Sequence, residues 1–74
     1  MSTLTLYSTS ACHLCELAKA LLEASAVAFE EVDIADSDAL FERYGVRIPV
    51  LRQADGRELG WPFGPQELAD FLNA

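Results

Sequence analysis

The sequence predicts an α/β domain in which a four-stranded mixed sheet is flanked by helices. Strand patterns and helix patterns alternate along the chain in the order β-α-β-α-β-β-α. The first β-α-β unit must cross over right-handed, so its two strands are parallel. An Asp55-Gly56 pair between the last two strands predicts a hairpin, which adds an antiparallel pair. A chain of 74 residues has room for one small domain, residues 1–74.

The first half of the chain contains a strand, a helix and a second strand. Residues 3–7 alternate polar and apolar side chains, which is typical of a strand, and polar Ser8 to Ser10 follow as loop or cap. Apolar residues then recur at helical spacing and predict one buried face of a helix of about three turns. They are Leu14, Leu17, Ala18, Leu21 and Leu22. Residues 27–34 are rich in β-branched and aromatic side chains and predict the second strand.

A short second helix precedes the third strand. Residues 36–38 offer N-cap side chains, and apolar residues follow at positions 40, 41 and 44. Gly45 stands where a left-handed C-terminal cap is expected. Residues 48–51 form a short apolar run that predicts the third strand.

The hairpin and the last helix complete the predicted fold. The Asp55-Gly56 pair favours a type I′ turn, and residues 57–59 form the second arm. Pro65 stands where a first helical residue is favoured. The apolar face of this helix consists of Leu68, Phe71 and Leu72.

The composition is acidic. Five Lys and Arg residues against twelve Asp and Glu residues leave a net charge of −7. This charge repels phosphate backbones and anionic lipid, so we expect neither nucleic acid nor a membrane surface as partner. No apolar run approaches the roughly 20 residues of a membrane-spanning helix. The N-terminal residues carry no basic region followed by an apolar stretch, so we expect a cytoplasmic protein. We also expect a monomer.

Two cysteines, Cys12 and Cys15, form a C-x-x-C pair between the first predicted strand and the first predicted helix. A disulfide across so short a loop constrains the unfolded chain very little. The pair is therefore predicted to have a chemical role rather than to stabilise the fold as a cross-link. The free N–H groups and partial positive charge of a helix N-terminus stabilise a thiolate. Cys12 is therefore predicted to be the nucleophile. Cys15, one turn later on the same face, is predicted to resolve the mixed disulfide that forms at Cys12.

Other interpretations of the pair remain open. Two buried cysteines can act simply as small apolar side chains. Structural zinc needs four ligands, and the only candidates near the pair are Cys12, His13 and Cys15, so no metal site is predicted. Two chains can share an iron–sulfur cluster with outside thiols, which defines a rival class, a non-catalytic module that binds a cluster or a partner protein. His13 either stabilises the thiolate when protonated or is an exposed side chain with little effect.

The chain from Thr3 to Leu72 resembles the thioredoxin superfamily, and its short length resembles glutaredoxin and its small relatives. The resemblance rests on the strand, the C-x-x-C pair at a helix start, and Ile48-Pro49-Val50 before a hairpin and a final helix. It implies a minimal thioredoxin fold with Cys12 as the attacking thiol and Cys15 as the resolving thiol. It also implies that Pro49 is a cis-proline facing them, although proline statistics alone favour trans. The backbone of Ile48 is implied to pair with the bound thiol substrate.

The chain departs from the usual glutaredoxin pattern where glutathione binds. His13-Leu14 replaces the usual Pro-Tyr, and Thr9 replaces a lysine three residues before the first cysteine. Gly60-Trp61-Pro62 replaces a Gly-Gly pair followed by an acidic residue. Arg47 either offers a cation to a carboxylate or is a solvated loop charge. Trp61 either packs on the core beneath the last helix or lines the active-site groove.

The sequence thus predicts a glutaredoxin-like thiol–disulfide oxidoreductase that works through a mixed disulfide. Its substrate is expected to be a disulfide-containing protein or a small thiol compound. Its electron donor is expected to be glutathione or a thioredoxin-reductase-type system. No cofactor is expected beyond the redox-active disulfide.

Overall fold

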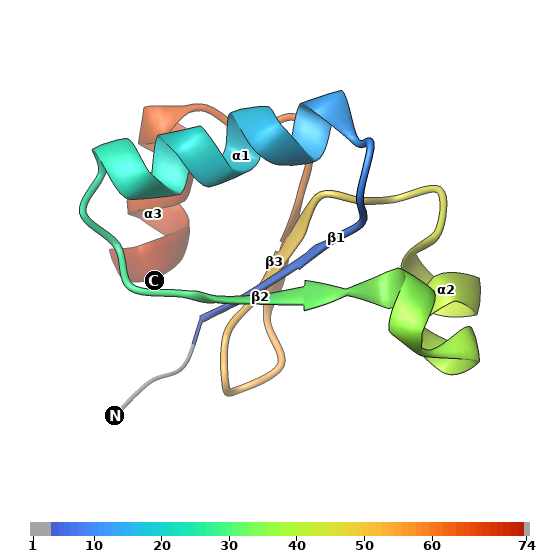
Figure 1. Ribbon diagram of the computed structural model, residues 1–74. Coiled ribbons are helices and arrows are strands. Elements are labelled where there is room, and N and C mark those ends of the chain that lie inside the picture. Colours follow the sequence, from blue (N-terminus) through green and yellow to red (C-terminus); the bar gives the residue numbers. More distant parts are fainter. Residues whose placement is uncertain (1–3, 74) are drawn as a thin grey trace.

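A computed structural model describes residues 4–73 and confirms the predicted fold class (Figure 1). The elements in chain order are β1 (Thr5–Ser8), α1 (His13–Ala24), β2 (Glu30–Asp33), the 3-10 helix η1 (Ile34–Asp36), α2 (Asp38–Tyr44), β3 (Val50–Arg52), β4 (Glu58–Gly60) and α3 (Pro65–Asn73). The sheet order is β2-β1-β3-β4, and β1 is parallel to β2 but antiparallel to β3. Residue 3 of the first predicted strand lies outside the described residues.

The sheet separates two apolar clusters. The first cluster joins the sheet to α1 and α3, and its buried members are Leu4, Leu6, Ala18, Leu22, Leu51, Phe63 and Leu68. The second cluster joins the opposite face to α2, and its buried members are Tyr7, Ile34, Tyr44 and Val50. Successive strand residues point to opposite faces, so the neighbours Leu6 and Tyr7 belong to different clusters. Both faces of the small sheet are therefore used for packing.

Two predicted strands are shorter than expected. β2 covers residues 30–33 rather than 27–34, and Val27 and Phe29 pack against the first cluster from the preceding loop. The chain leaves the strand at Asp33, whose carboxylate caps η1 by accepting a hydrogen bond from the N–H of Ala35, 2.9 Å away. β3 begins at Val50 rather than at residue 48, because Pro49 has no N–H to donate to the ladder.

Two turn predictions are wrong. Gly45 has φ −51° and ψ −37°, which is right-handed rather than left-handed backbone. Glycine suits this position for another reason, since a Cβ there would lie 2.5 Å from the carbonyl oxygen of Phe41. In the hairpin, the Gly56 N–H donates to the Gln53 carbonyl at 2.9 Å, and only Gly56 has a positive φ, +95°. This is a turn with a left-handed glycine at its end, not a type I′ turn.

The buried face of α1 also differs from the prediction. Its buried residues are Cys15, Ala18 and Leu22, whereas Leu14 and Leu17 are each 44% exposed. Figure 1 shows the reason, because α3 lies beside the C-terminal half of α1 and leaves the flank of its first turns uncovered. The start of α3 at Pro65 is as predicted.

Candidate functional site

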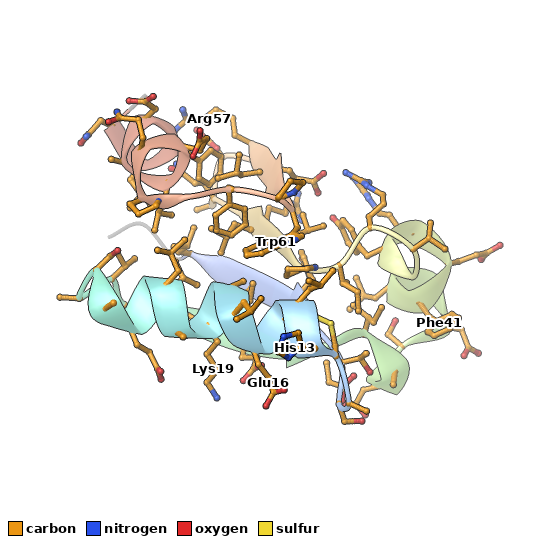
Figure 2. All side chains as sticks on the ribbon, turned by 90° about the horizontal axis from the view of Figure 1, so that it is seen from above. His13, Glu16, Lys19, Phe41, Arg57 and Trp61 are labelled. Atoms are coloured by element: carbon orange, nitrogen blue, oxygen red, sulfur yellow. A yellow bond between two sulfur atoms is a disulfide. The ribbon has the colours of Figure 1, made fainter. Side chains whose placement is uncertain are left out.

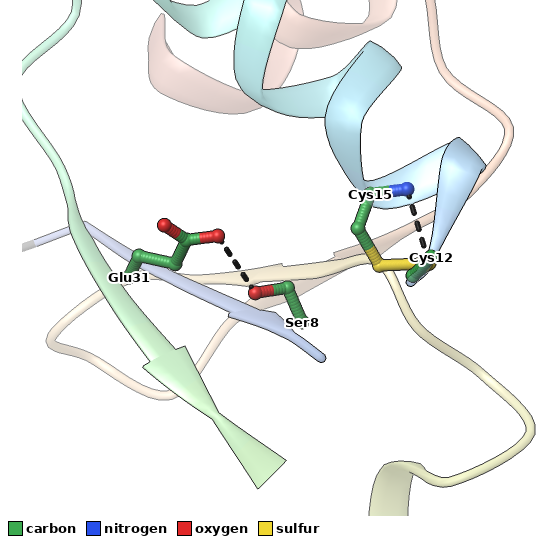
Figure 3. Close-up of a disulfide and its surroundings, with 4 residues drawn as sticks. All are labelled: Ser8, Cys12, Cys15 and Glu31. Atoms are coloured by element: carbon green, nitrogen blue, oxygen red, sulfur yellow. Dashed lines mark hydrogen bonds between the residues drawn. A yellow bond between two sulfur atoms is a disulfide. The ribbon is translucent and has the colours of Figure 1, made fainter. Parts of the chain in front are cut away.

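The two cysteines form a disulfide at the start of α1 (Figure 3). Their Cα atoms are 5.2 Å apart, and Cys12 is the N-cap residue of the helix, with extended backbone. The Cys15 N–H donates a hydrogen bond to the Cys12 sulfur, 3.2 Å away. Cys15 is only 3% exposed, whereas Cys12 is half-buried. Cys12 is therefore the more accessible sulfur, and a backbone N–H already points at it.

The connection from β1 to the cysteine pair contains a left-handed residue. Ala11 has φ +59°, a conformation that a residue with a Cβ adopts rarely. This turn reverses the chain between the end of β1 and the helix, so that Cys12 reaches the N-cap position. No pattern in the sequence predicted it.

Pro49 lies at the same end of the sheet as the disulfide. Tyr7 is the register partner of Val50, so Pro49 continues the antiparallel pairing beside Ser8, where β1 leads toward Cys12. Figures 1 and 3 both show the segment before β3 passing the disulfide loop. The Ile48-Pro49 bond is cis, as the resemblance implies, and the Trp61-Pro62 bond is cis as well.

The backbone of Ile48 is partly engaged inside the chain. Its N–H donates to the Tyr44 carbonyl at 3.1 Å, and the Arg47 N–H donates to the same carbonyl at 2.8 Å. The next carbonyl along the chain, that of Pro49, accepts the Trp61 N–H at 3.2 Å. These bonds hold the segment between α2 and β3 at both of its ends. Pairing of Ile48 with a substrate stays a prediction.

A pocket of about 460 Å³ opens beside the disulfide on the β2 side of α1. Cys12, Cys15, Lys19 and Glu31 are among its lining residues. The Glu31 carboxylate accepts a hydrogen bond from the buried hydroxyl of Ser8 at 2.9 Å (Figure 3). It also pairs with the Lys19 ammonium at 3.3 Å. The pocket therefore gives water and small polar groups a route toward the buried Cys15.

Sequence reasoning did not connect Ser8, Lys19 and Glu31 to the cysteine pair. Their meeting depends on the register of β1 against β2, in which Leu6 is the partner of Glu31. That register places Glu31 on the face covered by α1, on the same side as Ser8. Ser8 was predicted as loop or cap, whereas it is the last residue of β1 and is buried.

The other predicted site residues do not line this pocket. His13 is the exposed first residue of α1, next to Cys12 (Figure 2). Trp61 packs partly on the first cluster, with its ring edge-on to Phe63 at a centroid distance of 5.1 Å, in agreement with the packing interpretation. Figure 2 shows it on the side of α1 where α3 lies. Arg47 pairs with Glu58, an arrangement that neither interpretation of this arginine included.

A polar cluster occupies the sheet face opposite the disulfide, and we call it the Glu58 cluster: Arg43, Tyr44, Arg47 and Glu58. The Glu58 carboxylate accepts a hydrogen bond from the Tyr44 hydroxyl and pairs with Arg47 at 3.2 Å. Arg43 lies 3.9 Å from the same carboxylate. Both guanidinium groups lie over the Tyr44 ring, each 5.4 Å from its centroid.

The Glu58 cluster shifts the titration of its central groups. The hydrogen bond from Tyr44 lowers the pKa of Glu58, burial opposes this, and the contacts with Arg47 lower the pKa further. Burial raises the pKa of the Tyr44 hydroxyl, and the hydrogen bond to Glu58 adds to that shift. Both effects favour a Glu58 carboxylate beside a neutral phenol.

Across residues 4–73, no three His, Cys, Asp or Glu side chains converge as ligands for a metal ion. Within the same residues, no helix has the length and apolar character needed to cross a membrane.

A β2-β1-β3-β4 sheet with a cysteine pair at the start of its first helix defines a protein of the thioredoxin fold. Residues 3–73 match the model of the glutaredoxin-like domain (DUF836), and the chain belongs to that family. Among curated protein sequences, no relative is detected.

Three solved structures illustrate the similarity. The chain is 49% identical to protein XcR50 from X. campestris, with a TM-score of 0.89 and 95% of each chain covered. It is 25% identical to protein Ne2328 from Nitrosomonas europaea, with a TM-score of 0.79, over 95% of this chain and 89% of that one. It is also 25% identical to a mutant of the thioredoxin-like protein BC3987, with a TM-score of 0.71, over 95% and 99% of the two chains.

Proposed function

We propose that this protein is a thiol–disulfide oxidoreductase that uses Cys12 and Cys15 through a mixed-disulfide intermediate. The observation that carries the proposal is the hydrogen bond from the Cys15 N–H to the Cys12 sulfur at the N-terminus of α1. A donor aimed at the sulfur and the partial positive charge of the helix both favour thiolate over thiol. Membership of the glutaredoxin-like family supports the same reaction class.

The reaction proceeds in two exchanges. The Cys12 thiolate attacks one sulfur of a substrate disulfide, forms a mixed disulfide and expels the other substrate sulfur as a thiolate. The Cys15 thiol loses its proton and attacks the Cys12 sulfur, which expels the second substrate thiolate and forms the Cys12–Cys15 disulfide. The substrate gains two electrons, and the protein loses two. A dithiol or two monothiols from the donor system then return the pair to the reduced form.

The difference in burial supports these roles. Cys12 is accessible to an incoming disulfide, whereas Cys15 is buried and lies where it can attack the Cys12 sulfur of the mixed disulfide. The two sulfurs carry the electrons themselves, so the proposal requires no cofactor. We further propose a disulfide-containing protein or small thiol compound as substrate, and a cytoplasmic setting that keeps the pair reduced between turnovers.

The deciding experiment is a redox titration of the cysteine pair with two alternative donors, glutathione and a thioredoxin-reductase system. Reduction by either donor, followed by reduction of a peptide disulfide, is the expected result. Cys12→Ser should abolish the reaction, and Cys15→Ser should accumulate the mixed disulfide because the resolving step is lost.

The rival function gives a different result in the same preparation. A brown protein with thiolate-to-iron absorption, and no disulfide reduction with either donor, would indicate the cluster-binding module instead. A colourless protein with two titratable thiols that reduces the peptide disulfide supports the oxidoreductase.

A further inference from the structure

We propose that Glu58 is a positioning residue that holds the Ile48-Pro49 segment in place for pairing with the substrate backbone. This inference rests on the proposed oxidoreductase function and assigns a role to a side chain on the face opposite the disulfide. Glu58 touches neither cysteine. It acts through the two residues that anchor the segment, Tyr44 and Arg47.

Glu58 holds the segment at two points. Its carboxylate accepts a hydrogen bond from the Tyr44 hydroxyl. The backbone carbonyl of Tyr44 in turn accepts hydrogen bonds from the N–H groups of Arg47 and Ile48. The same carboxylate pairs with the Arg47 guanidinium at 3.2 Å, one residue before Ile48. One carboxylate on β4 therefore holds the segment before β3 in two ways, through the Arg47 side chain and through the backbone that is hydrogen-bonded to Tyr44.

The anchor is packed against the sheet. The Glu58 side chain is 18% exposed, while the Arg47 side chain is 48% exposed, so the carboxylate is the fixed partner of the pair. Glu58 belongs to β4, which is hydrogen-bonded to β3, the strand that begins directly after Pro49. The Tyr44 ring is fixed as well, because it stacks on Tyr7 of β1 at a centroid distance of 4.4 Å.

Other charged groups on this sheet face do not replace Glu58. Register pairs place Glu30, Thr5, Arg52 and Glu58 in one row across the four strands. Glu30 is exposed on the edge strand and makes none of the ion pairs found within residues 4–73. Glu58 is the acidic residue of this row that reaches α2 and the segment before β3. Glu30 is therefore a matched control for the loss of one negative charge.

The test compares Glu58→Gln with Glu30→Gln in two single-turnover reactions of the reduced protein. One oxidant is a short synthetic peptide closed by one disulfide bond, which has a backbone that can pair with Ile48. The other is dithiobis(nitrobenzoate), which has no peptide backbone. Glu58→Gln should raise the half-saturating concentration of the peptide by about three- to tenfold, the factor that corresponds to one net hydrogen bond. Its rate with the aromatic disulfide should be unchanged, and Glu30→Gln should behave as wild type with both.

Amide hydrogen exchange at Ile48 reports the positioning independently of any reaction. Glu58→Gln should speed this exchange by a similar factor of about three to ten, whereas Glu30→Gln should leave it unchanged. Arg47→Gln removes the same ion pair from its other side and should give an effect of the same kind. Because Arg47 is at the surface, this variant also provides the test if Glu58→Gln does not fold.

Three results would overturn the inference. They are unchanged Ile48 exchange in Glu58→Gln, an unchanged half-saturating concentration for the peptide, and equal losses with the peptide and the aromatic disulfide. If wild-type protein fails to reduce the peptide at all, the proposed function is wrong, and the exchange measurement alone then decides whether Glu58 holds the segment.

Discussion

The backbone N–H of Cys15 donates a hydrogen bond to the sulfur of Cys12, 3.2 Å away, at the first turn of α1. The N-cap position is usually filled by an oxygen-bearing side chain that accepts this kind of bond. In this protein a sulfur fills it. In the proposed reaction the same contact would stabilise the Cys12 thiolate.

The first prediction concerns which thiol ionises. In the reduced protein, the Cys12 thiol should have a pKa below about 7.5, which is the upper end of the range for cysteines at helix N-termini. Thiolate absorbance followed against pH should show one such transition, lost in Cys12→Ser and kept in Cys15→Ser. Loss of the transition in Cys15→Ser alone would reverse the assigned roles.

The second prediction is weak turnover with glutathione. Glutathione is an anion, the chain has a net charge of −7, and Thr9 stands where the glutaredoxin pattern usually has a lysine. Arg47 is already paired with Glu58, so its cation is shared with an internal carboxylate. Each missing charge-assisted hydrogen bond costs about 1.5–3 kcal/mol, and two lost bonds correspond to about a hundredfold or more in affinity.

The assay for this prediction is glutathione-coupled reduction of a small mixed disulfide. Thr9→Lys should increase the rate, and Thr9→Gln is the uncharged control. Robust wild-type activity that disappears in Arg47→Ala would show that Arg47 binds glutathione and that the prediction is wrong.

The third prediction is a pH-dependent contribution of Glu58 to stability. The Tyr44 hydrogen bond holds the pKa of Glu58 below its ordinary value of about 4.3 in the folded protein. A carboxyl whose folded pKa is lowered stabilises the fold above its unfolded pKa, and this contribution disappears as the pH falls through the folded pKa. Wild type should therefore exceed Glu58→Gln in free energy of unfolding near neutral pH, and the difference should narrow below about pH 4.

Urea denaturation at several pH values measures this difference. Asp55 and Glu67 also have lowered pKa values, but both are present in the two proteins and cancel in the comparison. Glu30→Gln serves as the control for the loss of one negative charge. A gap of constant size across the pH range would contradict the prediction.

The fourth prediction is that position 45 needs glycine because a larger side chain would not fit there. A Cβ at Gly45 would lie 2.5 Å from the Phe41 carbonyl oxygen, which belongs to backbone and cannot rotate away. Gly45→Ala should therefore lower the free energy of unfolding by about 1–3 kcal/mol, the usual cost of overpacking. Gly60→Ala is the matched control, because a Cβ there meets nothing within 4 Å. Its effect should stay within about 0.5 kcal/mol, and equal effects of the two substitutions would refute the steric explanation.

Local sequence patterns predicted most of the fold. The alternation in residues 3–7 and the helical spacing in residues 14–22 marked β1 and α1, because side chains repeat every two residues in a strand and about every 3.6 in a helix. Pro65 marked the start of α3 through its fixed φ and missing N–H. The patterns failed at positions such as Gly45, where a nearby carbonyl rather than the local conformation selects glycine.

The order of elements and the position of Cys12 and Cys15 at the start of a helix were evident in the sequence, since both depend on residues a few positions apart. The meeting of Ser8, Lys19 and Glu31 beside Cys15, and the pairing of Glu58 with Arg47, emerged only when the chain was folded. The hydrogen bonds in these contacts join residues 11 and 23 positions apart on different elements. A shift of one residue in strand register would turn Glu31 or Glu58 to the opposite face. The register of β4 depends on the turn type of its hairpin, and the turn that forms is not the type I′ turn that the Asp55-Gly56 pair predicted.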